Sequence, residues 1–280
     1  MSAIHELQPA YSLAGFLVGL LVGVTGVGGG SLMTPILILL FGIDPATAVG
    51  TDLLYAAATK TAGSVAHGLN RTIEWRVVRR LAAGSIPMTG VTMSVLSMLD
   101  INSAAARGLI NAVLIFALVA TAIALVFRDR IVACYAAHLG ALAPRRVAIL
   151  TIVVGGALGT MVSISSVGAG AIGVTCLFLL YPKLPAARIV GSDIAHAVPL
   201  TLAAGIAHWL LGSIDLQVFL SLILGSIPGI LLGSFVAVRI PETALRLVLA
   251  ATLIAVATKL SFGLVPSSDS VAAAKASAPH

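Results

Sequence analysis

The chain has 280 residues, of which 59% are hydrophobic and 9% are charged, and its mean hydropathy is +1.10. This composition excludes an ordinary water-soluble domain and predicts an integral membrane protein. The formal net charge of +6 fits contact with anionic lipid. It does not indicate nucleic-acid binding, because the sequence has no basic stripe with interleaved aromatic residues.

About eight apolar windows predict membrane helices, because a bilayer core takes roughly 20 apolar residues as helix. In chain order the windows are 12–41, 46–69, 77–99, 104–127, 147–181, 186–211, 216–238 and 243–262. They are apolar on every face, whereas the strands of a membrane β-barrel alternate apolar and polar residues. The expected fold class is therefore an all-α polytopic membrane protein. Residues 1–12 contain no Lys or Arg, so the first window is not expected to be a removable signal peptide.

An internal repeat divides the chain. Shifting the sequence against itself by 140 or 141 residues brings rare residue types into register: Gly15 with Gly155, Gly28 with Gly168, Gly50 with Gly191, Asp52 with Asp193, His67 with His208, and the tetrapeptide GSIP at 84–87 with its copy at 225–228. Matches of Asp and His indicate duplication, because both are scarce in this chain. The expected organisation is a first transmembrane repeat (1–128), a basic cytoplasmic linker (129–145), a second transmembrane repeat (146–263) and a disordered C-terminal tail (264–280).

The first window of each repeat is interrupted by glycines. The interruptions run from Gly26 to Ser31 and from Ser163 to Ala171. Lipid does not satisfy free backbone N–H and C=O groups, so each break must face protein or a water-filled cavity. Repeated halves with broken helices are typical of secondary transporters, in which the breaks mark the binding site.

Two membrane topologies follow from these breaks. If every window crosses the membrane with the N-terminus inside, Lys183, Arg188, Arg239 and Arg246 lie outside. If each broken window is a re-entrant hairpin, the two halves become inverted repeats and twelve of the sixteen Lys and Arg residues lie inside. Cytoplasmic loops are enriched in Lys and Arg, so the sequence favours the second topology.

Six ionisable residues within the windows are candidates for coupling or gating, because charge inside a membrane is costly and usually functional. They are Asp52, Lys60 and His67 in the first half, and Asp193, His196 and His208 in the second. The aspartates either cap helices that restart after a glycine, or contact substrate or a proton. His67 and His208 either hold helix ends through hydrogen bonds or carry a proton or anion role. Lys60 either supplies a fixed charge to an anion site or extends to the membrane interface.

The breaks predict an anion site. A helix that starts at Gly30 or Gly170 presents unpaired N–H groups and its positive dipole end to the break. The candidate substrate-binding residues are Thr25, Gly26, Gly28, Gly29, Gly30, Ser31, Ser165, Ser166, Gly168, Ala169, Gly170 and Ala171, with Ser163 as a further hydroxyl. The alternative is that the glycines only allow close helix packing. The sequence has no P-loop, dinucleotide, hydrolase or zinc-protease motif, so neither an enzyme nor a cofactor or metal is expected.

Four segments resemble the TauE/SafE family of sulfite exporters: GVGGGSLMTPIL (26–37), GIDPATAVGTDL (42–53), SVGAGAIGV (166–174) and LPAARIVGSDIAHAVP (184–199). The resemblance implies a multi-pass permease of the bacterial inner membrane that moves sulfite, organosulfonates or related small anions. The family's motif positions fall on Gly26, Gly28, Gly29, Gly30, Pro35, Gly50, Asp52, Gly168, Gly170, Gly191 and Asp193. The second half departs from the first, with Ala169 for Gly29 and Thr175 for Pro35.

The function expected from these observations is secondary transport: export of sulfite or an organosulfonate, held between the two breaks. H⁺ or Na⁺ is a candidate coupling ion, and a homodimer is a candidate assembly. Two alternatives remain open at this point, an importer of another small anion and a membrane scaffold subunit that transports nothing.

Overall fold

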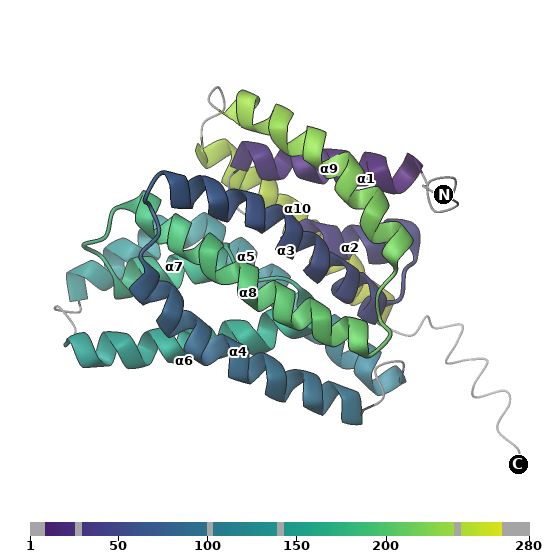
Figure 1. Cartoon of the computed structure of the whole chain (residues 1–280), viewed down its shortest axis with the longest axis horizontal. Helices are drawn as coiled ribbons and strands as arrows, with labels where there is room; N and C mark the ends of the chain where they lie inside the picture. The colour runs from purple at the N-terminus through teal and green to yellow at the C-terminus, as the bar shows by residue number, and fades with distance from the viewer. Residues whose placement is uncertain (1–8, 26–29, 100–102, 139–142, 238–241, 265–280) are drawn as a thin grey trace, which may run out of the picture.

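The computed structural model describes residues 9–25, 30–99, 103–138, 143–237 and 242–264, and these residues form ten helices (Figure 1). The helices are α1 (Pro9–Thr25), α2 (Gly30–Phe41), α3 (Pro45–Leu69), α4 (Trp75–Met98), α5 (Ala104–His138), α6 (Pro144–Ser165), α7 (Ala171–Leu180), α8 (Ala186–Leu210), α9 (Leu216–Ala237) and α10 (Glu242–Leu264). Within the described ranges, five stretches are long and apolar enough to cross a membrane: Trp75–Met98, Ala104–Cys134, Pro144–Ser165, Ala186–Leu210 and Leu216–Gly233. The protein is therefore a multi-pass helical membrane protein.

The helix order repeats from one half to the other. Each interrupted window becomes a pair of helices, α1 with α2 and α6 with α7, and three further helices complete each half. α6 ends at Ser165 and α7 begins at Ala171, where the sequence predicts the second break. The first break, at residues 26–29, lies outside the described residues. α5 continues to His138, so the predicted linker 129–145 begins within a helix.

Two closely packed pairs of helices join the two halves of the chain. α1 packs along α9 of the other half, and α6 packs along α4 (Figure 1). Both interfaces bring backbones together through glycine: Gly15 and Gly19 lie against Leu222 and Ser226, and the repeat-related Gly155 and Gly159 lie against Leu81 and Ser85. A Cβ atom at any of these four glycines would meet the backbone of the partner helix. Small residues allow membrane helices to approach this closely.

Each broken pair of helices folds back on itself. The Tyr11 ring near the start of α1 lies 4.5 Å, between centroids, from the Phe41 ring at the end of α2. In the second half, the Thr151 hydroxyl of α6 lies 2.8 Å from the hydroxyl of Tyr181, the residue after α7. These two pairs are related by the repeat, since both residues shift by 140. The start of α1 thus lies beside the end of α2, and an early turn of α6 lies beside the end of α7.

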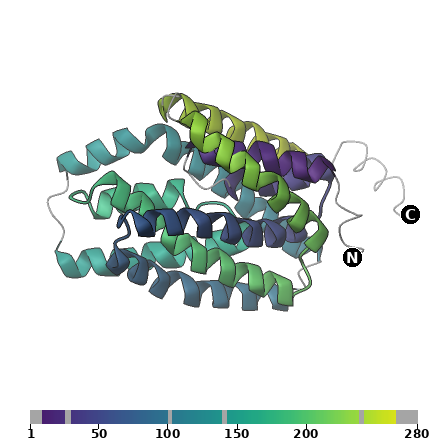
Figure 2. The ribbon, with the colours of Figure 1, turned by 45° about the horizontal axis from the view of Figure 1, so that its top comes forward.

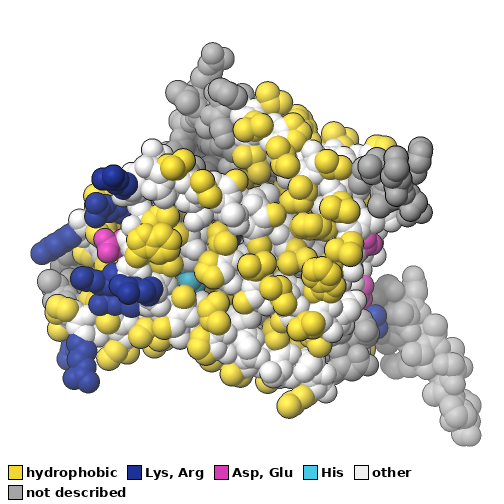
Figure 3. Space-filling model, in the orientation of Figure 1, with side chains coloured by type: hydrophobic (Ala, Val, Ile, Leu, Met, Phe, Trp, Pro, Cys, Tyr) yellow, Lys and Arg dark blue, Asp and Glu magenta, His cyan; other side chains and the backbone are white. Residues whose placement is uncertain are grey.

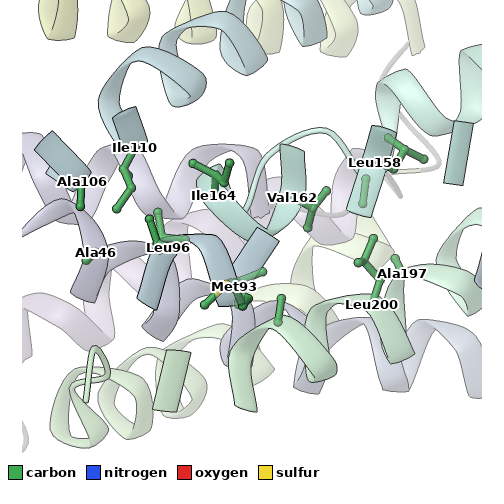
Figure 4. Close-up of a cluster of buried hydrophobic side chains, with 14 residues drawn as sticks. Ala46, Met93, Leu96, Ala106, Ile110, Leu158, Val162, Ile164, Ala197 and Leu200 are labelled. Carbon is green, nitrogen blue, oxygen red and sulfur yellow. The ribbon is translucent and has the colours of Figure 1, made fainter. Parts of the chain in front are cut away.

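α3 and α8 pack against each other and occupy the middle of the molecule, between the α1–α9 pair and the α4–α6 pair (Figure 2). A hydrophobic cluster joins them to neighbouring helices of both halves (Figure 4). It contains Ala46 of α3, Met93 of α4, Ile110 of α5, Val162 of α6 and Leu200 of α8, each no more than 5% exposed. The second break contributes Ala169 to this cluster.

Basic side chains gather at one end of the molecule, at the left of Figure 3. Interactions connect the helix ends there. Arg80 of α4 donates a hydrogen bond to the Tyr181 hydroxyl, Arg188 of α8 pairs with Glu74 at 3.6 Å, and Arg246 of α10 pairs with Asp129 of α5 at 3.2 Å. The beginnings of α4, α8 and α10 and the ends of α5 and α7 therefore share this end.

Candidate functional site

The break between α6 and α7 has a backbone that only certain residues adopt. Ser166 caps α6 in a left-handed conformation with φ 58°, and Gly168 and Gly170 have φ 113° and 135°. Side chains are strongly disfavoured at the two glycine values. Gly168 and Gly170 are therefore required by the shape of the break, beyond any need for close packing.

Lys60 of α3 reaches this break from the other half of the chain. Its ammonium donates a hydrogen bond of 3.2 Å to the carbonyl oxygen of Ala169. The residue is 7% exposed, so its charged end does not extend to the membrane interface. Lys60 is therefore a buried charge beside the break, and its role as the fixed charge of an anion site remains a prediction.

Asp52 binds the helix that follows the first break. Its Oδ2 atom accepts hydrogen bonds from the backbone N–H of Thr34 at 3.2 Å and from the Thr34 hydroxyl at 2.5 Å. α3 runs without interruption through Asp52. The alternative in which Asp52 caps a helix that restarts beside it is therefore wrong, and the side chain instead binds a donor of the neighbouring helix α2.

Asp193 occupies the repeat-related position and lies beside the helix that follows the second break. α8 is also continuous there, so Asp193 does not cap a restarted helix either. A Cβ atom added to Gly173 of α7 would collide with Oδ1 of Asp193. Each aspartate thus lies against the short helix after the break of its own half.

Lys60 lies in the field of both carboxylates, because it interacts electrostatically with Asp193 and with Asp52. The hydroxyl of Ser166 lies near Asp52 without the geometry of a hydrogen bond, and His196 lies near Lys60. Four buried atoms of this group have no hydrogen-bond partner among the described residues: Asp52 Oδ1, Asp193 Oδ1, Ser166 Oγ and His196 Nδ1. We refer to Asp52, Lys60, Ser166, Asp193 and His196 as the Lys60 cluster.

His196 is anchored at its other nitrogen. Nε2 lies 2.8 Å from the hydroxyl of Ser85 in α4, and the ring is fully buried. Ser85 belongs to the first copy of the GSIP tetrapeptide. That contact fixes the ring, while its unpartnered Nδ1 remains available to a further group.

His67 and His208 lie at helix ends and hold the turns that follow. Nδ1 of His67 lies 2.7 Å from the Thr72 hydroxyl, and Nδ1 of His208 lies 3.2 Å from the Ser213 hydroxyl. Nε2 of His208 also lies 2.9 Å from the carbonyl oxygen of Ser163. These contacts correspond to the alternative in which the histidines hold helix ends.

Residues next to the aspartates connect the two halves at equivalent positions. The Ser192 hydroxyl accepts a hydrogen bond of 2.8 Å from the backbone N–H of Glu74, just before α4. The Thr51 hydroxyl accepts one of 3.1 Å from the backbone N–H of Asp215, just before α9. In the Gly-Thr/Ser-Asp motif, the hydroxyl residue therefore binds the start of a helix in the other half.

The hydroxyls predicted at the break differ in their availability. Ser163 donates to the Gly159 carbonyl at 2.7 Å, and Ser165 donates to the Met161 carbonyl at 2.7 Å. Both bonds lie within α6, so Ser166 is the serine of this break whose hydroxyl has no partner among the described atoms. Ala171 begins α7 directly after Gly170.

The structure describes only the residues on either side of the first break. Gly26, Gly28 and Gly29 lie outside the described residues, while Thr25 ends α1 and Gly30 and Ser31 begin α2. Thr34, Ser85 and Gly173, which contact the cluster, were missed from the sequence, because only the tertiary arrangement brings them there. Across the described ranges, no group of three or more His, Cys, Asp or Glu side chains has a metal-binding arrangement.

Comparison with known proteins agrees with this architecture. Residues 11–260 match the family described as "Sulfite exporter TauE/SafE". The chain is 38% identical over 251 residues to "Probable membrane transporter protein YjnA" of Bacillus subtilis (strain 168), covering 89% of this chain and 97% of that protein. It is 39% identical over 82 residues to "Probable membrane transporter protein YunE" of the same organism, covering 29% of this chain and 30% of that protein. No solved structure matches the chain.

The family match extends over both halves, from α1 to α10, and includes the breaks, the aspartates and Lys60. The chain therefore belongs to the sulfite exporter TauE/SafE family and is a membrane transporter.

Proposed function

We propose that the protein is a secondary transporter of the bacterial inner membrane that exports sulfite or an organosulfonate. The observation that carries the proposal is the Lys60 cluster: a buried ammonium beside a helix break, surrounded by buried polar atoms without partners. Buried polar groups are normally hydrogen-bonded, so such a group indicates a place where a ligand binds. Family membership supports a small anion as that ligand.

The anion lies between the two breaks. The first N–H groups of α2 and α7 and the positive ends of these helices favour negative charge there. Ser166 and Lys60 add a hydroxyl and a positive charge on the same side. Asp52 and Asp193 fix the two short helices relative to α3 and α8, because each lies against one of them.

In the proposed topology each broken pair is a re-entrant hairpin, and the halves are inverted. The contacts Tyr11–Phe41 and Thr151–Tyr181 support hairpins, because each joins an early turn of one helix to the end of the next. The collection of Arg80, Arg188 and Arg246 at one end supports inversion. By the enrichment of Lys and Arg in cytoplasmic loops, that end faces the cytoplasm.

Substrate flux tests the transport proposal. Purified protein in liposomes is expected to exchange labelled sulfite or a sulfonate against the same unlabelled anion. Gly170→Val is expected to abolish this exchange, because φ 135° is closed to valine, and Gly29→Val is expected to do the same at the first break. Gly90→Val is the matched control, because a Cβ atom at Gly90 meets nothing within 4 Å. Exchange at the wild-type rate in both Gly170→Val and Gly29→Val would refute the proposed site.

Cysteine labelling tests the topology. In a background without Cys134 and Cys176, single cysteines replace Arg71, between α3 and α4, and Lys183, between α7 and α8. The re-entrant topology places both on the cytoplasmic side, so an impermeant thiol reagent labels both from that side. Labelling of the two positions from opposite sides would show instead that the broken windows cross the membrane.

A further inference from the structure

Unpartnered polar atoms are concentrated around one lysine. In the described part of the chain, the buried side-chain atoms without a hydrogen-bond partner are Asp52 Oδ1, Tyr55 Oη, Asn111 Oδ1, Thr121 Oγ1, Ser166 Oγ, Asp193 Oδ1 and His196 Nδ1. Five of these seven atoms lie near Lys60. Two belong to Asp52 and Asp193, which interact electrostatically with Lys60, and one belongs to His196, which does the same. The other two belong to Tyr55 and Ser166, which are neighbours of Asp52. The concentration points to a group that the protein binds there and releases.

The charges of the cluster do not balance. Lys60 contributes +1, while Asp52 and Asp193 together contribute −2, which leaves −1 at a place where all three side chains are buried. An uncompensated charge away from water costs several kcal/mol or more, so a buried group of this kind takes up a proton or a counter-ion. One added positive charge makes the cluster neutral.

Among the residues that the structure describes, the elements around the aspartates offer no second lysine or arginine. Facing Asp52 are Thr34 of α2, Tyr55 of its own helix and Ser166 of the break. α8 contributes Asp193 and His196, and α4 contributes the Ser85 hydroxyl bound to His196. Two further titratable groups lie nearby among the described residues: the free thiol of Cys176 in α7, which interacts with Asp193, and His208, which binds the Ser163 carbonyl.

Lys60 binds a backbone oxygen of the kind that a sodium ion would need. Na⁺ in transporters of broken-helix architecture is held by carboxylates and by carbonyl oxygens of unwound backbone. Here the carbonyl oxygen of Ala169 is bound to the Lys60 ammonium, which also lies in the field of Asp193 and Asp52. The repeat-related position holds Thr201, so the second half has no equivalent charge.

We propose that Asp52, Lys60 and Asp193 form a proton-binding site, and that the transporter is coupled to H⁺ and not to Na⁺. The built-in ammonium binds the carbonyl oxygen of Ala169, and one proton taken up by either carboxylate supplies the missing charge. The cluster is neutral with that proton and carries −1 without it. The inference rests on the proposed function, because a coupling ion requires a transported substrate.

Substitution of one aspartate at a time tests whether the carboxylates are needed for proton movement in a protein that still folds. Asp52→Asn and Asp193→Asn each leave one carboxylate and one ammonium, so the cluster is neutral without a proton. We expect both variants to fold, and we expect the number of protons moved per anion transported to fall to zero in each, whatever the rate at which the variant exchanges the anion. Asp129→Asn is the control, because Asp129 lies at the charged end with its side chain 81% exposed.

The experiment uses liposomes that contain a pH-sensitive dye, with the membrane potential clamped. Exchange of labelled for unlabelled anion is measured first, because it needs no coupling gradient. Net flux of the exchanged anion is then measured in sodium and in choline buffer. Methanesulfonate is the preferred anion, because it carries no titratable proton near neutral pH. Sulfite binds and releases protons itself. When sulfite is used, the proton movement measured with Asp193→Asn is therefore subtracted from that of the wild type.

The expected result is net flux at the same rate in sodium and choline, accompanied by proton movement that is lost in both aspartate variants and kept in Asp129→Asn. Stimulation of wild-type flux by sodium would overturn the inference. So would flux without proton movement, or proton movement unchanged in both aspartate variants. Absence of exchange for every anion tested would instead remove the proposed function, and the inference with it.

Discussion

The ammonium of Lys60 lies 3.2 Å from the carbonyl oxygen of Ala169, although 109 residues separate them in the chain. This hydrogen bond joins α3 of the first half to the helix break of the second. Thr201 stands at the position related to Lys60 by the repeat. A duplicated architecture therefore carries a site in which only one half supplies the charge.

Gly173→Ala is expected to impair transport without loss of the fold. The added methyl group would meet Oδ1 of Asp193, so the carboxylate or α7 has to shift. A displacement of catalytic or binding groups by about 1 Å is enough to reduce function by roughly 100-fold. Anion exchange in liposomes measures the effect.

The matched control for this change is Gly108→Ala. A Cβ atom at Gly108 in α5 meets nothing within 4 Å, and alanine is favoured over glycine within a helix by about 0.5–1 kcal/mol. Gly108→Ala should therefore exchange anions as the wild type does. Equal activity of the Gly108 and Gly173 variants would contradict the placement of Asp193.

Gly84→Ala is expected to destabilise the protein through the α4–α6 interface. Its Cβ atom would collide with the backbone carbonyl of Ile152, and overpacking of this kind typically costs about 1–3 kcal/mol. Thermal unfolding in detergent should show a lower midpoint. Gly90→Ala on the same helix has open space and should leave the midpoint unchanged or higher; a midpoint lowered equally by both would rule out the backbone contact as the cause.

His208→Ala is expected to reduce stability and to leave proton coupling unchanged. The ring is fully buried and contacts Ser213 and the Ser163 carbonyl, and a buried group left unpartnered costs about 1–3 kcal/mol. His67→Ala should cost less, because His67 is partly exposed. If His208→Ala instead abolished substrate-linked proton movement in a stable protein, His208 would belong to the coupling site.

The second break could be predicted from the sequence, because it depends on glycines in conformations that other residues avoid, and the duplication is visible in residue types that are rare in the chain. Asp52 and Asp193 occupy equivalent positions in the two halves, and aspartate is too rare in this chain for such a match to arise as easily as a match of Leu or Ala. Gly168 and Gly170 take positive φ values, as glycines in a helix break are expected to do. These features are local, or repeat along the chain, so no tertiary information is needed to find them.

The partners of the aspartates could not be predicted. Thr34 and Gly173 reach them only because the short helices α2 and α7 lie against α3 and α8. Likewise, the left-handed backbone of Ser166 decides that its hydroxyl, and not that of Ser165, remains unpartnered. The alternative of restarted helices was wrong because a Gly-Thr/Ser-Asp sequence within a packed membrane helix does not interrupt it.

The most direct test of the proposed site is the affinity of the purified protein for sulfite, measured by titration calorimetry on the wild type and Lys60→Met. Loss of a charged hydrogen bond costs about 1.5–3 kcal/mol, so the account predicts a Kd raised by roughly 10- to 150-fold. Lys259→Met, at an exposed position of α10, should bind as the wild type does. An unchanged Kd in a folded Lys60→Met protein would contradict the account.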